Sequence, residues 1–183
     1  TGIKNLGSAA ILEPIIYQCI QFIIAILIAL IAGEALSAKY HARNFLTFAV
    51  AFSLSLGTLM QINIASFYGQ NNLLQVQSFY KKCLKYGLLA VIIITTLSTL
   101  GTYLFMGNYL TNKNVQYYTI LIMLAGIIIE PLRLLSITSK AHLYGLQKAN
   151  LPLILSLANK LLIVLPLLYF SSKTPNLGIL AVL

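Results

Sequence analysis

The feature that most constrains the fold of this chain is a series of apolar runs, each close to the length of a membrane-crossing helix. A helix needs about 20 mostly apolar residues to cross the hydrocarbon core of a bilayer. Five runs are complete and a sixth is cut short; they cover residues 6–32, 44–67, 85–106, 117–139, 151–170 and 176–183. The runs are apolar on all sides and do not alternate with period two, which argues against a β-barrel. The sequence therefore predicts an all-α, polytopic bundle of membrane helices.

Composition supports a lipid environment. Of the 183 residues, 59% are hydrophobic and 8% are charged, whereas a soluble domain is about 45–50% apolar and about 25% charged. The net charge of +9 suggests an anionic partner. Because the lysines fall between the apolar runs and not on one patch, an anionic membrane leaflet explains them better than nucleic acid does. We treat residues 1–183 as a single transmembrane unit and expect it to be part of a longer chain.

Short connections and the distribution of basic residues predict the topology. Short loops place neighbouring helices antiparallel. Six basic residues lie on the side of the N-terminus, whereas four basic residues and Glu34 lie on the other side. Positive residues are enriched in cytoplasmic loops, so we expect the N-terminal end to be cytoplasmic. The two sets are Lys4, Lys81, Lys82, Lys85, Lys140 and Lys148, against Lys39, Arg43, Lys113 and Lys173.

The longest polar segment, residues 68–87, contains a Gly-Gln-Asn-Asn turn followed by an amphipathic stretch. In one interpretation Leu73, Leu74, Val76 and Phe79 lie on lipid while the adjacent lysines face headgroups. In the other, the segment is an ordinary positively charged cytoplasmic loop.

Motifs of enzymes are absent from the sequence. It contains no Gly-rich phosphate loop, no GxSxG, no HExxH and no CxxC. The lack of aspartate argues against most carboxylate-based metal and phosphoryl-transfer sites. His41 and His142 lie near the ends of runs, and Cys19 and Cys83 are far apart, so none of them suggests a ligand set. We therefore expect no catalytic residues and no metal, and a function carried by groups inside the spans.

Two of the three acidic residues of the chain stand directly before prolines inside apolar runs: Glu13 in "ILEPIIY" and Glu130 in "IIIEPLR". An ionisable residue within a membrane span suggests a functional site. Since burial in lipid disfavours a charged carboxylate, either residue could take up a proton near neutral pH. The alternative is structural, with each carboxylate bonded to a neighbouring helix. We predict Glu13 and Glu130 as ion- or proton-coupling residues.

The surroundings of these acids are informative. Pro14 and Pro131 each remove one backbone hydrogen bond, which frees the carbonyl of the residue four positions earlier. Freed carbonyls at membrane depth are tolerated where a cavity or partner satisfies them, as in the discontinuous helices of transporters. Arg133 follows Glu130 by three residues, so both lie on one helix face and an ion pair would partly neutralise them.

Polar residues within the spans are candidates for a substrate cavity, although most such residues simply bond to other helices. The predicted set is Tyr17, Gln18, Gln21, Gln61, Asn63, Arg133, Asn159 and Lys160.

The order of several segments resembles one half of a multidrug and toxic compound extrusion (MATE) transporter. The segments are "LGSAAILEPIIYQ", then "LIAGEALSAKYHARNFLTFAVAFSLSLGTLMQINIASFYGQNN", and later "SKAHLYGLQKANLPLILSLANKLLIVLPLLY". They are similar to the family's G-x-P-x-A-L-E start, its L-G-x-E-A-L-A-A and V-G-Q-x-x-G motifs, and its L-R-G-x-G-D-x-R-x-P turn. The "AKYHARN" and "YGQNN" segments look more like the C-terminal half, and the resemblance covers about residues 5–183.

This resemblance implies one six-helix lobe of a twelve-helix, multi-pass protein of the bacterial inner membrane, paired with a second lobe. It implies export of organic cations or other amphiphiles in exchange for protons or sodium ions, with no cofactor besides the coupling ion. In gap-free alignment the family's fourth-helix acid falls at Arg133, one turn from Glu130, and the "GLQKANLP" turn lacks the family's aspartate. Other interpretations are a flippase for lipid-linked oligosaccharides of the same superfamily, a non-transporting scaffold, and an integral lipid-modifying enzyme, which the missing motifs disfavour.

Overall fold

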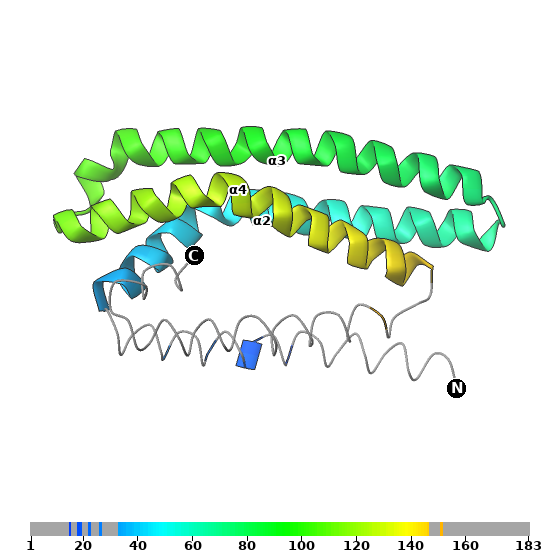
Figure 1. The fold of residues 1–183 in the computed structure, drawn as a ribbon, viewed down its shortest axis with the longest axis horizontal. Helices are drawn as coiled ribbons and strands as arrows, with labels where there is room; N and C mark the ends of the chain where they lie inside the picture. The colour runs from blue at the N-terminus through cyan, green and yellow to red at the C-terminus, as the bar shows by residue number, and fades with distance from the viewer. Residues whose placement is uncertain are drawn as a thin grey trace.

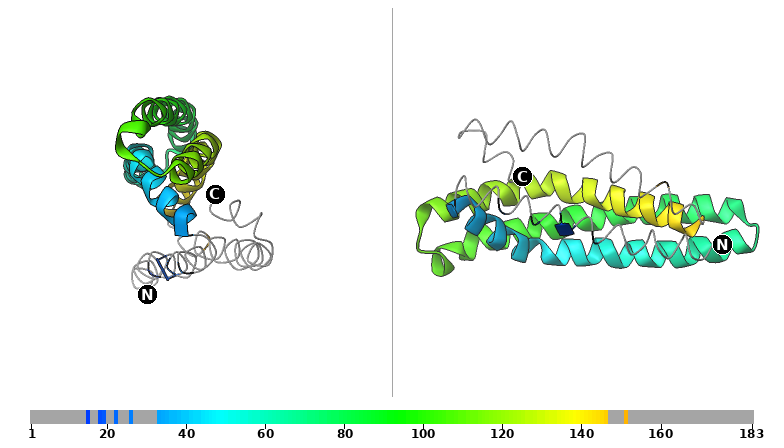
Figure 2. Two further views of the ribbon diagram at one scale, coloured as in Figure 1. Left: turned by 90° about the vertical axis from the view of Figure 1, so that its left-hand side faces the viewer. Right: turned by 90° about the horizontal axis from the view of Figure 1, so that it is seen from below.

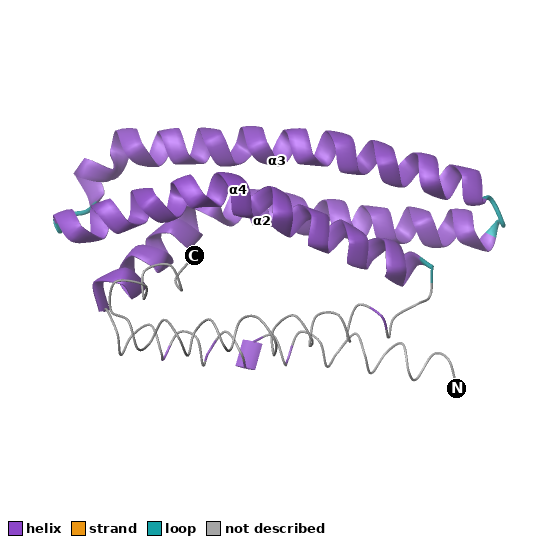
Figure 3. Cartoon of the chain, in the orientation of Figure 1, coloured by secondary structure: helices purple, strands orange, loops and turns teal. Residues whose placement is uncertain are grey.

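Three long helices make up the part of the chain that the computed structural model describes, namely residues 33–146 together with Ile15, Gln18, Cys19, Phe22, Ile26 and Leu151. They are α2 (Gly33–Gly69), α3 (Leu73–Tyr109) and α4 (Lys113–Gly145), and no strand occurs among these residues (Figures 1 and 3). Each is long and apolar enough to cross a membrane. The runs at 6–32, 151–170 and 176–183 fall almost wholly outside the described residues, so the count of six helices stays a prediction.

The helices extend well beyond the apolar runs that predicted them. The expected loop at residues 33–43 is wrong, because this segment forms the first turns of α2. Likewise α3 begins at Leu73 and not at residue 85, so the amphipathic stretch is continuous with the span. At 1.5 Å per residue a 37-residue helix is about 55 Å long, against about 30 Å of hydrocarbon. Hydropathy therefore marked the part of each helix that matches the bilayer and not the helix ends.

Two asparagine-capped turns connect the helices. Asn71 adopts a left-handed conformation with φ 57°, and the Asn72 side chain accepts a hydrogen bond of 3.1 Å from the Gln75 amide at the start of α3. The Asn112 side chain caps α4 by accepting from the Asn114 amide at 2.9 Å. The turn predicted from "YGQNN" and the antiparallel course of neighbouring helices are thus confirmed, as Figures 1 and 2 show.

Each helix contacts the other two, and the α2–α4 interface is the most extensive. Two apolar clusters lie between the helices. The first, near the α2–α3 turn, contains Met60, Ile64, Val76 and Ala141, and the second, toward the α3–α4 connection, contains Ala42, Leu46 and Met123.

The amphipathic stretch at the start of α3 divides between lipid and core. Leu73 and Leu74 are exposed. By contrast, Val76 is buried, and Phe79 packs edge-on against Phe67 with ring centroids 5.7 Å apart. Placing Val76 and Phe79 on lipid is therefore wrong, because their side of α3 faces α2 and α4.

Both α2 and α4 bend along their length (Figure 1). Early in α2, the Thr47 hydroxyl donates to the Arg43 carbonyl at 2.9 Å, a contact that often bends helices. Pro131 lies near the middle of α4 and removes the hydrogen bond to the Ile127 carbonyl. The helix nevertheless continues through the proline to Gly145.

Close approach of α2 and α4 depends on glycine. A Cβ at Gly145 would lie 2.7 Å from Ile64 Cγ2 and 3.2 Å from the Gln61 carbonyl oxygen, and one at Gly57 would lie 2.6 Å from Ile137 Cγ2. Small residues allow membrane helices to pack with their backbones close together. These glycines therefore set the separation between α2 and α4, the helix that carries Glu130.

Candidate functional site

Most buried polar side chains in the bundle satisfy their hydrogen bonds within their own helix. Each buried serine or threonine hydroxyl donates to the carbonyl four residues earlier; these residues are Ser53, Thr95, Thr99, Thr102, Thr119 and Thr138. Among the buried side-chain nitrogen and oxygen atoms of the described region, only Glu130 Oε2 and His142 Nδ1 have no hydrogen-bond partner. Because an unpaired buried polar atom is costly, both positions call for an explanation.

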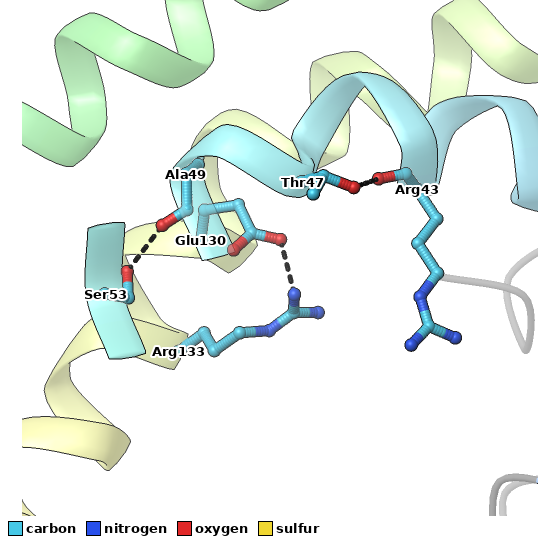
Figure 4. Close-up of polar contacts among 6 residues, drawn as sticks. All are labelled: Arg43, Thr47, Ala49, Ser53, Glu130 and Arg133. Carbon is cyan, nitrogen blue, oxygen red and sulfur yellow. Dashed lines mark hydrogen bonds and ion pairs between the residues drawn. The ribbon is translucent and has the colours of Figure 1, made fainter. Parts of the chain in front are cut away.

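Glu130 lies on α4 and is 1% exposed. It stands between the two apolar clusters, and its carboxylate is directed toward Arg133 (Figure 4). Its Oε1 lies 2.9 Å from Arg133 Nη1, so the ion pair predicted from the spacing of these residues is confirmed. The arginine side chain is 43% exposed, so the pair connects the interior of the bundle with its surface.

The arrangement around Glu130 has the chemistry of a cation acceptor. One carboxylate oxygen is held by Arg133, while Oε2 remains available to a proton or a small cation. Because Pro131 has no backbone N–H, the Ile127 carbonyl, which lies one turn earlier, lacks its usual amide donor. Among the described residues, no group of three or more His, Cys, Asp or Glu side chains gathers to form a metal site.

The second unpaired atom belongs to His142 near the end of α4. Its ring lies against Tyr80 of α3, with centroids 4.7 Å apart, and the Tyr80 hydroxyl is 3.5 Å from Ser139 Oγ. These contacts tie α3 to α4 beside the cluster of Met60, Ile64, Val76 and Ala141. We assign His142 a packing role.

A pocket of about 490 Å³ opens between residues of the first apolar run and the start of α2. Its lining residues are Gln18, Cys19, Phe22, Leu36, Lys39, Tyr40 and Arg43. Lys39 and Arg43 are one helical turn apart, and Lys39 is half-buried. Sequence reasoning placed both cations in a loop and missed this site. The i,i+4 spacing of two cations was the available signal.

The third acidic residue, Glu34, is bound at the opposite end of the helices from the α2–α3 turn. Its carboxylate accepts hydrogen bonds from the side-chain amides of Asn112 at 3.2 Å and Asn114 at 3.1 Å. These contacts hold the start of α2 against the α3–α4 connection. Glu34 therefore acts as a clamp between these segments.

The other predicted site residues are dispersed. Gln18 lines the pocket. Gln61 is exposed on α2, and the Asn63 amide donates to the Leu59 carbonyl of its own helix at 2.8 Å. Both lie closer to the α2–α3 turn than Glu130 does, and neither forms a hydrogen bond with it. Glu13, Tyr17, Gln21, Asn159 and Lys160 lie outside the described residues.

One comparison with known proteins adds to this geometry. The MatE family model matches residues 9–170, which is most of the chain. No curated protein and no solved structure matches it.

Proposed function

The chain belongs to the MatE family, whose members are membrane transporters or flippases and not enzymes, and from this premise we propose that it is one lobe of a secondary active transporter. In this proposal it exports organic cations or other amphiphilic molecules in exchange for protons or sodium ions. A second six-helix lobe completes the translocation path, and the N-terminal end of this lobe faces the cytoplasm of a bacterial cell.

The observation that carries the proposal is the unpaired Oε2 of Glu130. A carboxylate oxygen without a donor, 1% exposed and between two apolar clusters, is costly for a purely structural residue. A coupling residue must instead keep a vacant acceptor for its ion. The cost is then offset whenever the ion is bound.

Arg133 supplies a second state for this carboxylate. With Glu130 ionised, the charge-assisted hydrogen bond at 2.9 Å holds the arginine against α4. A proton or sodium ion on the carboxylate weakens that attraction and releases the exposed guanidinium. Because Pro131 interrupts the hydrogen bonds of α4 at this level, we propose that ion binding at Glu130, together with Glu13, changes the bend of the helix and the access of the lobe.

A flippase for lipid-linked oligosaccharides is the second candidate. One observation favours it, since the described pocket is lined by Lys39 and Arg43 and by no acidic residue. Anionic pyrophosphate-linked lipids fit such a lining better than organic cations do. Efflux of a cationic dye from proteoliposomes, compared with translocation of a labelled polyprenyl-linked sugar, separates the two substrate classes.

The proposed coupling is tested in proteoliposomes that contain the intact transporter under an imposed proton or sodium gradient. We expect Glu130→Gln to abolish the acceleration of transport by the gradient, while exchange of substrate without a gradient persists. The same result is expected for Glu13→Gln. Glu34→Gln is the matched control, because this acid is bound to amides at the helix ends. If Glu130→Gln responded to both gradients like the wild type, the coupling role would be refuted.

A further inference from the structure

We propose that the pocket at the start of α2 binds an anionic group attached to an apolar or aromatic body, through Lys39 and Arg43. This inference rests on the proposed transport function, because that function implies an amphiphilic ligand that enters from the membrane or from water. The main observation is that two cations, one helical turn apart, line a pocket of about 490 Å³. Phe22 and Tyr40 line the same pocket. Ligand pockets commonly have volumes of about 300–1,000 Å³.

Counting carboxylates shows that the pocket has an excess of positive charge. The chain has three acidic residues. Glu130 pairs with Arg133, and Glu34 is bound by Asn112 and Asn114. Only Glu13 is left, and wherever it lies its single charge cannot neutralise both pocket cations. Like charges at i and i+4 also repel each other, and a bound anion would relieve this repulsion.

The remaining lining residues define the body of the ligand. Phe22 and Tyr40 are both more than half exposed, at 69% and 55%, so their rings are available for stacking or apolar contact. Leu36 adds an aliphatic surface, and Gln18 offers an amide that can donate or accept. A carboxylate, sulfonate or phosphate beside an aromatic or acyl group matches this lining.

The depth of the pocket allows two sources for such a ligand. Lys39 and Arg43 lie about 9 and 15 Å from the start of α2 at 1.5 Å per residue, before the apolar run 44–67 that matches the bilayer. At this depth either a dissolved amphiphile or the headgroup of an anionic lipid can reach them, and both carry the same chemistry.

Cys19 provides a reporter inside the pocket, because it is exposed and belongs to the lining. In the intact transporter with its other cysteines replaced by alanine, held in nanodiscs of zwitterionic lipid, Cys19 is reacted with anionic and cationic thiosulfonates of similar size. We expect the anionic reagent to react about tenfold faster after correction for its intrinsic rate. Lys39→Gln with Arg43→Gln should bring the ratio close to one, whereas Lys81→Gln with Lys82→Gln should leave it unchanged.

Protection of Cys19 then identifies the source of the ligand. A soluble naphthalene sulfonate that slows labelling in zwitterionic discs indicates a dissolved ligand. Slower labelling when phosphatidylglycerol is added to the discs indicates a lipid headgroup. Either result supports the proposal, provided that the pocket double variant loses the protection. The proposal is overturned if neither probe protects Cys19. It is also overturned if the ratio of the anionic to the cationic labelling rate is the same in the pocket variant and the wild type.

Direct binding of the radiolabelled sulfonate to protein with its native cysteines keeps the proposal testable if the cysteine replacements prevent folding. Here the pocket variant should bind at least about tenfold more weakly than the Lys81/Lys82 control, and equal affinity refutes the site. Glu130→Gln should keep both the reagent ratio and the binding. The two proposals can therefore fail separately. If Glu130→Gln keeps gradient coupling, the coupling proposal fails, and if the pocket variant keeps ligand binding, the pocket proposal fails.

Discussion

Glu130 and Arg133 form an ion pair across one turn of α4, in which the carboxylate is 1% exposed and the guanidinium 43% exposed. The two members therefore differ in what they lose when the partner is removed. The arginine reaches the surface of the described bundle, where its long side chain can extend toward other partners. The carboxylate has only Arg133 as a hydrogen-bond partner among the described residues.

This asymmetry predicts unequal effects of single substitutions at the pair. Arg133→Gln leaves a buried carboxylate without its ionic partner and should lower the free energy of unfolding by about 1–3 kcal/mol. Glu130→Gln should cost less, and the double variant should regain part of the loss, because removing both partners leaves no unpaired charge. Thermal unfolding of the transporter in detergent measures all three variants. Equal losses for the two single variants would contradict the asymmetry.

The glycine at the end of α4 should be intolerant of a methyl group. Gly145→Ala places a Cβ 2.7 Å from Ile64 Cγ2 and 3.2 Å from a backbone oxygen, so it should lower stability by about 1–3 kcal/mol through overpacking. Gly101→Ala is the matched control, since a Cβ at that helical position meets nothing within 4 Å. There alanine should stabilise the helix, by up to about 1 kcal/mol. A melting temperature for Gly145→Ala that equals or exceeds that of the wild type would show that α2 and α4 are not in close contact at Gly145.

The clamp at Glu34 should control opening of the helix ends. Glu34→Ala or Asn114→Ala removes one partner of a hydrogen bond of 3.1 Å, and we expect faster amide hydrogen exchange in the α3–α4 connection as local opening becomes easier. Combining the two substitutions should add little to Glu34→Ala alone, because that change already removes the contact with Asn114. Asn71→Ala at the opposite end is the control and should leave exchange near residues 110–116 unaltered. Additive effects would indicate that Glu34 and Asn114 act independently.

Properties that depend on local patterns were predictable from the sequence. Long apolar runs required helices that satisfy their own backbone hydrogen bonds in lipid. Asparagines at positions 71 and 72 predicted the α2–α3 turn, and the spacing of Glu130 and Arg133 predicted their ion pair. The order of segments was sufficient to predict the family, which the match over residues 9–170 confirms.

Properties that depend on contacts between distant segments were decided only by the tertiary structure. Hydropathy could not locate the start of α2, so Lys39 and Arg43 were assigned to a loop although they face a pocket with Phe22. The burial of Val76 likewise depends on which side of α3 meets the other helices. The physical reason is that helix register is set by close packing at positions such as Gly57 and Gly145, summed over pairs far apart in the chain. Periodicity within one segment carries no information about those pairs.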